Sequence, residues 1–137
     1  MSDCVFCNIA NGLIPSARVH EDRLTLAFMD IGEVNPGHVL VAVKPHVENI
    51  FDLDDTLAAA VFQTAARVAR AVKKAYSPEG VTLYQANGSA AGQTVYHFHL
   101  HLVPRYDKDG MHLVWPAKNP PHKQLEANAA RIRAVLE

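Results

Sequence analysis

The stretch His97-Phe98-His99-Leu100-His101-Leu102-Val103 decides how this chain folds. Three histidines alternate with large apolar residues, and strict alternation predicts a half-buried β-strand. Because successive side chains on a strand point to opposite faces, the histidines share one face, and Phe98, Leu100 and Leu102 enter a core. Next-nearest side chains on a strand lie roughly 6.5–7 Å apart, so three imidazoles line one small polar site. A neutral imidazole is a nucleophile, a general base and a metal ligand near pH 7. The three histidines on one strand face therefore predict a functional site that uses imidazole groups.

The remaining sequence predicts further strands and two helices. Apolar runs bounded by turn residues favour strands at residues 18–21, 25–30, 38–43 and 81–86. Apolar residues at spacings of three and four predict a long helix from about Asp54 to Ala75 and a final helix over about 123–136. Residues 1–16 indicate a short, knuckle-like segment. Strands grouped around one long helix, without strict β-α alternation, predict an α+β fold with an antiparallel sheet.

Composition restricts the kinds of partner that we expect. At 137 residues and 49% hydrophobic, the chain is long and apolar enough for one globular domain with a core. Its formal net charge is −1, so the chain has no net positive charge to attract a nucleic acid polymer or an anionic membrane. We find neither a signal peptide nor a transmembrane run. These features predict a cytoplasmic protein.

The histidine strand also resembles a known family. It fits the histidine-triad (HIT) pattern His-φ-His-φ-His-φ-φ, where φ is apolar, without a mismatch. Other segments resemble the same family: Gly92-Gln93-Thr94-Val95-Tyr96, Pro104-Arg105, Asn35-Pro36-Gly37-His38-Val39-Leu40-Val41, Cys4-Val5-Phe6-Cys7 and Ile14-Pro15. The resemblance covers about residues 4–105. It implies a single HIT domain over 1–137 with a C-terminal extension at 106–137, a HIT-like sheet and a homodimer.

The resemblance also implies a catalytic role for two of the histidines. In the family, the middle histidine attacks the α-phosphorus of a nucleotide and holds the nucleotidyl group as a covalent phosphoramidate, a role that falls on His99. His101, Gln93 and Thr94 are then expected to face the phosphate as donors, and Asn87 to add another. The alternative for Gln93, Thr94 and Asn87 is ordinary loop polarity.

Nucleoside recognition requires an acceptor for the ribose hydroxyls and an apolar slot for the base. By resemblance, Asp30 contacts the ribose and Ile31 packs on the base. The expected partner is thus a small molecule of the purine-nucleotide type, although the sequence does not fix purine over pyrimidine. Taken alone, Asp30 is a turn residue that ends a strand.

A second site is indicated by Cys4 and Cys7, which have the two-residue spacing that clamps a zinc ion. Tetrahedral closure needs two more ligands, and resemblance to the zinc-bearing members implies His46 and His97. We therefore expect structural zinc and no organic cofactor. The alternatives are a disulfide or two idle thiols. A redox pair has less support, because no βαβ pattern surrounds it.

The leading functional hypothesis is a hydrolase of nucleoside 5′-phosphate derivatives of the phosphoramidate type. Pro104-Arg105 resembles the dinucleoside-polyphosphate hydrolases instead, whereas Trp115-Pro116 resembles the phosphoramidases. A nucleotide-binding adaptor with incidental catalysis is the alternative from another class. One metal ion shared by His97 and His101 is disfavoured, because residues i and i+4 on a strand lie roughly 13 Å apart. Trp115 either reaches an active site or fills a core gap.

Overall fold

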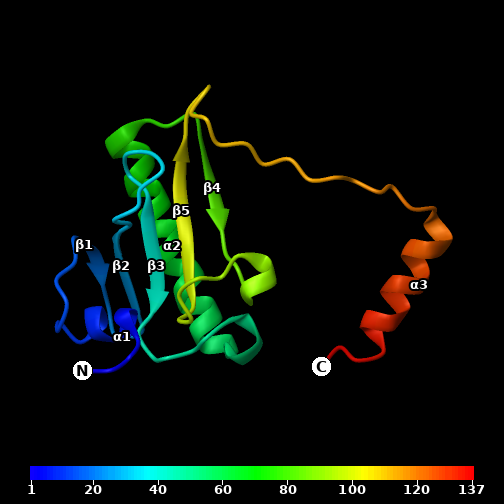
Figure 1. Ribbon diagram of the computed structural model, residues 1–137, viewed down its shortest axis with the longest axis horizontal. Helices are drawn as coiled ribbons and strands as arrows, with labels where there is room; N and C mark the ends of the chain where they lie inside the picture. The colour runs from blue at the N-terminus through cyan, green and yellow to red at the C-terminus, as the bar shows by residue number, and fades with distance from the viewer.

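The histidine strand lies inside a five-stranded antiparallel sheet with the order β1-β2-β3-β5-β4. The computed structural model describes residues 1–137 and is drawn in Figure 1. Its strands are β1 (Arg18–Glu21), β2 (Thr25–Met29), β3 (Val39–Val43), β4 (Gly80–Tyr84) and β5 (His99–Arg105). The predicted α+β fold with an antiparallel sheet is confirmed, and the strand bounds agree with the prediction to within two residues.

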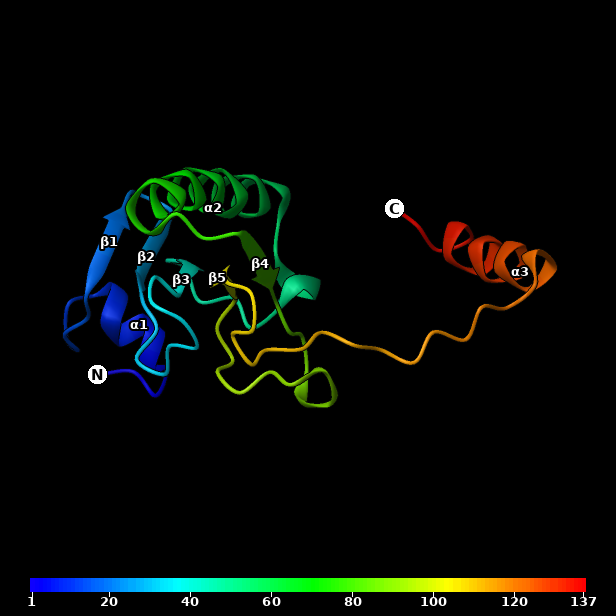
Figure 2. The ribbon, with the colours of Figure 1, turned by 90° about the horizontal axis from the view of Figure 1, so that it is seen from above.

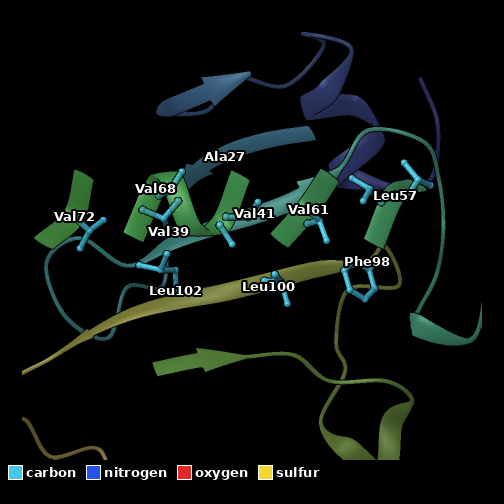
Figure 3. Close-up of a cluster of buried hydrophobic side chains, with 12 residues drawn as sticks. Ala27, Val39, Val41, Leu57, Val61, Val68, Val72, Phe98, Leu100 and Leu102 are labelled. Atoms are coloured by element: carbon cyan, nitrogen blue, oxygen red, sulfur yellow. The ribbon is translucent and has the colours of Figure 1, made fainter. Parts of the chain in front are cut away.

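Helix α2 (Asp55–Tyr76) covers one face of the sheet, as Figure 2 shows. Asp54 caps it by accepting a hydrogen bond from the Leu57 N–H, and Lys73 and Lys74 occupy the last turn, as the helix dipole favours. Its apolar stripe packs on alternate strand residues to form the main core (Figure 3). This core contains Ala27, Val39, Val41, Val43, Leu57, Val61, Ala65, Val68, Val72, Phe98, Leu100 and Leu102.

The opposite face of the sheet is covered by α1 (Val5–Ala10), a short helix that the sequence did not reveal. Phe6 and Ile9 pack there on side chains of β2 and β3, and the Phe6 and Phe28 rings meet edge to face at 5.3 Å. Cys4 caps this helix, since its Sγ accepts a hydrogen bond from the Cys7 N–H. The expected knuckle is therefore a helical turn that brings two thiols together.

The predicted alternation of the histidine strand is confirmed, but the regular strand begins at His99. Phe98 donates its N–H to the Val47 carbonyl at 2.6 Å, outside the strand ladder. Its side chain still enters the α2 core. The rings of His97 and His99 both lie against Phe6, with ring centroids at 5.9 and 4.9 Å, so they share the α1 face.

Beyond Arg105 the chain leaves the body of the protein on the side of β4 and ends in α3 (His122–Arg133), as Figure 1 shows. No residue of α3 is buried. Trp115 is 76% exposed, so it fills no core gap within the chain. Two 3₁₀ turns, η1 (Ile50–Asp52) and η2 (Ser89–Ala91), lie in the loops. No helix combines the length and the apolar character needed to cross a bilayer.

Candidate functional site

A cavity of about 430 Å³ lies between α1 and the sheet, on the face that carries the histidines. Phe6, Ile9, Phe28 and Leu40 are among the apolar residues of its wall. The polar side chains that line it come from the N-terminal part of the chain and from the histidine stretch and the loop before it: Ser16, Asp30, Thr94, His99 and His101. An apolar slot with a few convergent polar groups is the usual form of a small-molecule site.

His99 is held in one tautomer by the backbone. Its Nδ1 lies 2.6 Å from the His97 carbonyl oxygen. A carbonyl only accepts hydrogen bonds, so the proton must sit on Nδ1, and Nε2 keeps its lone pair. Burial lowers the pKa of His99 from its usual value, which keeps the ring neutral at neutral pH. His99 thus presents an unprotonated nitrogen to ligands or electrophiles.

A chain of hydrogen bonds fixes the tautomer of His101. The Val34 N–H donates to His38 Nδ1 at 3.1 Å, so neutral His38 carries its proton on Nε2. That Nε2 lies 3.0 Å from His101 Nδ1, which must therefore accept. His101 keeps its own proton on Nε2 as a donor. Burial, followed by the nearby His99 and His38, lowers the pKa of His101 to about 4, so it is neutral at pH 7.

His38 is a site residue that the sequence analysis quoted in a motif without giving it a role. It is 3% exposed and precedes β3. The sequence signal that could have identified it was a histidine at the first position of the predicted apolar strand 38–43. Its position beside His101 follows only from the β3–β5 pairing, in which Leu40 lies opposite His101.

Asp30 follows β2 and lies beside this chain of hydrogen bonds. Its Oδ1 accepts the Gly32 N–H at 2.8 Å, as expected of a turn residue. Its Oδ2 lies 3.3 Å from His38 Nε2 and 3.6 Å from His101 Nδ1. The carboxylate therefore combines a turn contact with a place on the cavity wall, and neighbouring Ile31 also lines the cavity with a fully exposed side chain.

Of the loop residues predicted to face the phosphate, only Thr94 lines the cavity. Gln93 is buried: its Oε1 accepts the Gly88 N–H at 2.7 Å and its Nε2 donates to the Glu48 carbonyl at 2.7 Å. Asn87 Oδ1 accepts the Ile50 N–H at 2.8 Å. The structure thus brings neither Gln93 nor Asn87 to the histidines, and both brace the loop.

The predicted metal residues gather at the N-terminus of α1. One ligand atom from each of Cys4, Cys7, His46 and His97 lies within 4.8 Å of the others. His97 Nδ1 lies 3.2 Å from Cys4 Sγ and 3.5 Å from Cys7 Sγ, and His46 Nδ1 lies 3.4 Å from Cys7 Sγ. Tetrahedral zinc with ordinary bond lengths separates sulfur and nitrogen ligands by about 3.6 Å, close to these distances.

The tautomer of His97 and the raised pKa of the Cys7 thiol also favour a bound cation at this cluster. His97 Nε2 lies 2.6 Å from the Val43 carbonyl, so it carries the proton and Nδ1 turns its lone pair to the thiols. Cys4 and Cys7 are free, so no disulfide joins them. Burial and the adjacent Cys4 raise the pKa of the Cys7 thiol to about 11, because two sulfurs here lack a compensating charge. The donor set fits a bound metal ion.

Comparison with known proteins identifies the family. The HIT domain matches residues 11–108, more than half of the chain. The chain is 46% identical over 114 residues to Protein hit of Bacillus subtilis, a match that covers 82% of this chain and 79% of that protein. This protein therefore belongs to the HIT family.

Two of the relatives have named activities. One is adenosine 5′-monophosphoramidase of Schizosaccharomyces pombe, 31% identical over 135 residues that cover 98% of each chain. The other is an adenylylsulfatase of Arabidopsis thaliana, 32% identical over 108 residues, which cover 79% of this chain and 55% of that protein. The family thus includes hydrolases of nucleotide derivatives.

Solved structures agree with the fold. A HIT family protein from Bacillus anthracis superposes with a TM-score of 0.95 at 39% identity, covering 99% of each chain. A superposition of this quality includes residues 106–137, so the C-terminal segment extends from the body in that crystal structure too. A zinc-bound histidine triad protein from Mycobacterium smegmatis has a TM-score of 0.76 at 33% identity, with 96% of each chain covered.

Proposed function

We propose that this protein hydrolyses nucleoside 5′-phosphate derivatives of the phosphoramidate type through a covalent nucleotidyl intermediate on His99. The observation that carries the proposal is the hydrogen bond from His99 Nδ1–H to the His97 carbonyl. It leaves Nε2 as a neutral nucleophile in a cavity that also holds a second imidazole and a carboxylate.

The chemistry proceeds in two displacements. The lone pair of His99 Nε2 forms a bond to the α-phosphorus while the P–N bond to the leaving amine breaks, and the amine departs with the electron pair of that bond and with a proton taken up from solvent. The His99 ring becomes cationic. Its Nδ1–H donates to the His97 carbonyl, with Nδ1 2.6 Å from the oxygen, and this hydrogen bond stabilises the positive charge. Water then attacks phosphorus and releases a proton to solvent, while the N–P bond breaks and its electron pair returns to His99 Nε2. The products are a nucleoside 5′-monophosphate and a neutral His99.

His101 is the expected phosphate donor, because its tautomer keeps a proton on Nε2. Thr94 supplies a hydroxyl to the same cavity. A fixed donor aimed at developing charge lowers the barrier without reorganisation. Asp30 is proposed to accept the ribose hydroxyls and Ile31 to pack on a base of the purine type, while Gln93 and Asn87 shape the loop.

Zinc is proposed at Cys4, Cys7, His46 and His97 as a structural ion. A closed site with four protein ligands leaves no position for a substrate, and such sites contribute chiefly to folding. The zinc-bound relative supports this assignment. Free thiols and a nucleotide substrate suit a reducing compartment, so we propose a cytoplasmic location.

The decisive experiment is a single-turnover reaction with adenosine 5′-phosphoramidate, quenched in denaturant and measured by intact-protein mass spectrometry. The wild type should gain one adenylyl group, and His99→Ala should gain none and lose nearly all turnover. His101→Asn should form the same adduct more slowly, because it loses a donor and keeps the attacking atom. A folded His99→Ala that still turns over refutes the mechanism.

The same assay separates the alternatives. Higher kcat/KM for dinucleoside polyphosphates than for phosphoramidates would favour the polyphosphate hydrolase. An adaptor would bind adenosine 5′-monophosphate in calorimetry and form no adduct with any substrate.

A further inference from the structure

The hydroxyl of Ser16 is the one buried polar side-chain group of the protein that has no hydrogen-bond partner in the chain. Buried hydroxyls are nearly always paired, because an unpaired one destabilises the folded state, so each exception requires an explanation. Alanine would fit at the same position and leave no polar atom unpaired. The hydroxyl therefore contributes nothing to the stability of the free protein, which points to a ligand.

Ser16 lines the cavity that holds the histidines. The pairing of β1 with β2 continues beyond the strand to Ala17, whose carbonyl accepts the Met29 N–H at 2.9 Å, so this segment is extended. Arg18, two residues after Ser16, donates from its guanidinium to the Ile9 carbonyl of α1. Residues two apart on an extended segment point to the same face, which directs Ser16 to the α1 face, where the cavity lies. A serine side chain turns about one bond among staggered positions, so the hydroxyl can be presented to a ligand there.

The polar groups of the cavity follow the order of the strands, which runs β1, β2, β3, β5 from left to right in Figure 1. His99 is on β5, Asp30 follows β2, and Ser16 precedes β1. Neighbouring strands lie about 4.8 Å apart, so three strand spacings, roughly 14 Å, separate Ser16 from the histidine strand. A nucleotide with its α-phosphorus at His99 and its ribose at Asp30 therefore directs its base toward Ser16. Ile14 and Ile31 line the same cavity and offer apolar surface to the base.

We propose that the Ser16 hydroxyl hydrogen-bonds the edge of the nucleobase that is remote from the ribose. This inference rests on the proposed nucleotide site, and it adds a polar contact where Ile31 offers only apolar surface. A hydroxyl both donates and accepts. It can donate to N1 of adenine and accept from the 6-amino group, or donate to the 6-oxo group of hypoxanthine and accept from N1–H. The contact thus accepts amino and oxo bases alike and disfavours a ring of the same shape with an apolar edge.

The first test measures nucleotide binding by calorimetry. Ser16→Ala should weaken the binding of adenosine 5′-monophosphate and of inosine 5′-monophosphate by about fivefold to tenfold each, since it removes one neutral hydrogen bond. Benzimidazole riboside 5′-monophosphate is the matched control ligand, because its six-membered ring contains neither nitrogen nor oxygen while its shape, ribose and phosphate match those of a purine nucleotide. Its Kd should differ less than about twofold between the wild type and Ser16→Ala. Equal weakening of all these ligands would show that Ser16 acts on the ribose or on the shape of the cavity and would overturn the proposal, as would an unchanged Kd for both purine nucleotides.

The second test measures the stability of the ligand-free protein. The urea midpoint of Ser16→Ala should equal or exceed that of the wild type, because the substitution removes a buried hydroxyl that has no partner. A lower midpoint would show that the hydroxyl is bonded within the folded chain, and the argument for a ligand contact would fail.

The binding test separates this proposal from the proposed mechanism, because nucleoside monophosphates bind without the covalent step. A wild type that binds adenosine 5′-monophosphate more tightly than Ser16→Ala does, but forms no adduct, refutes the role of His99 and supports that of Ser16. A wild type that forms the adduct, with a Ser16→Ala variant of unchanged affinity, does the reverse. A wild type that binds none of these nucleotides overturns both proposals.

Discussion

Replacing His38 by Phe tests whether the tautomer of His101 matters for the chemistry. Phe fills a similar volume at this 3% exposed position but has no N–H to offer to His101 Nδ1 at 3.0 Å. The Val34 N–H also loses its acceptor. His101 then loses the contact that fixes its proton on Nε2, and its N–H is no longer held toward the cavity.

The expected loss follows from the interactions removed. A neutral hydrogen bond contributes about 0.5–1.5 kcal/mol net, which gives a lower limit of about twofold to twelvefold on the loss of kcat. Complete loss of one preorganised donor costs about 10²–10³ in kcat. Because His101 remains in the cavity and still offers its N–H part of the time, we expect kcat to fall by about 10–100-fold with little change in KM.

His38→Gln is the matched control, because its amide N–H extends about as far as the imidazole Nε2–H. We expect it to recover most of kcat. Nitrogen-15 spectra of His101 give a readout that a merely structural role would not change: protonated Nε2 and bare Nδ1 in the wild type and His38→Gln, mixed tautomers in His38→Phe. A folded His38→Phe enzyme with kcat within threefold of the wild type, or an unchanged His101 tautomer, would refute the reasoning.

Three further predictions concern the ribose contact, the metal and pH. Asp30→Asn should weaken ribonucleotide binding about tenfold or more, because a bond to a charged acceptor is worth about 1.5–3 kcal/mol, and should hardly affect a 2′,3′-dideoxy analogue; equal losses in calorimetry would remove Asp30 from the ribose site. Elemental analysis should find about one zinc per chain, and Cys7→Ser should lose it together with thermal stability; a metal-free wild type of equal stability would contradict this. Because the pKa of His101 is lowered to about 4 from the ordinary value near 6.5, the unfolded chain binds its proton first as pH falls. Stability should therefore drop between about pH 6.5 and 4, and the urea midpoint of His101→Asn should drop less over that range; identical slopes would contradict the assignment.

The periodicity of apolar residues predicted which face of a single strand or helix is buried. The alternation around His99 placed Phe98, Leu100 and Leu102 in the α2 core, and the stripe from Leu57 to Val72 formed the facing surface. Both patterns reflect the burial of apolar area, which the local sequence records directly. Helix α1 escaped prediction because six residues are too few to display a helical period.

The contacts of polar side chains were harder to predict, because they depend on which groups, remote in sequence, become close in the folded structure. Gln93 was expected at the phosphate, but the Gly88 N–H and the Glu48 carbonyl occupy its amide. His38 received no role, because its partner is 63 residues away across a strand pair. The metal cluster was predicted by family resemblance, and spacing alone could supply only its two cysteines.

His97 joins the metal cluster to the nucleophile through three different atoms. Its Nδ1 faces the thiols, its Nε2–H donates to the Val43 carbonyl, and its own carbonyl accepts the His99 Nδ1–H. Loss of the metal would thus disturb His99 only if it moved that carbonyl. The Phe98 N–H bond to the Val47 carbonyl and the 1% exposed Phe98 side chain hold the same peptide from the other side. The backbone contact that sets the tautomer of His99 is therefore anchored by the core, and removing the metal should cost more in stability than in the rate of the first displacement.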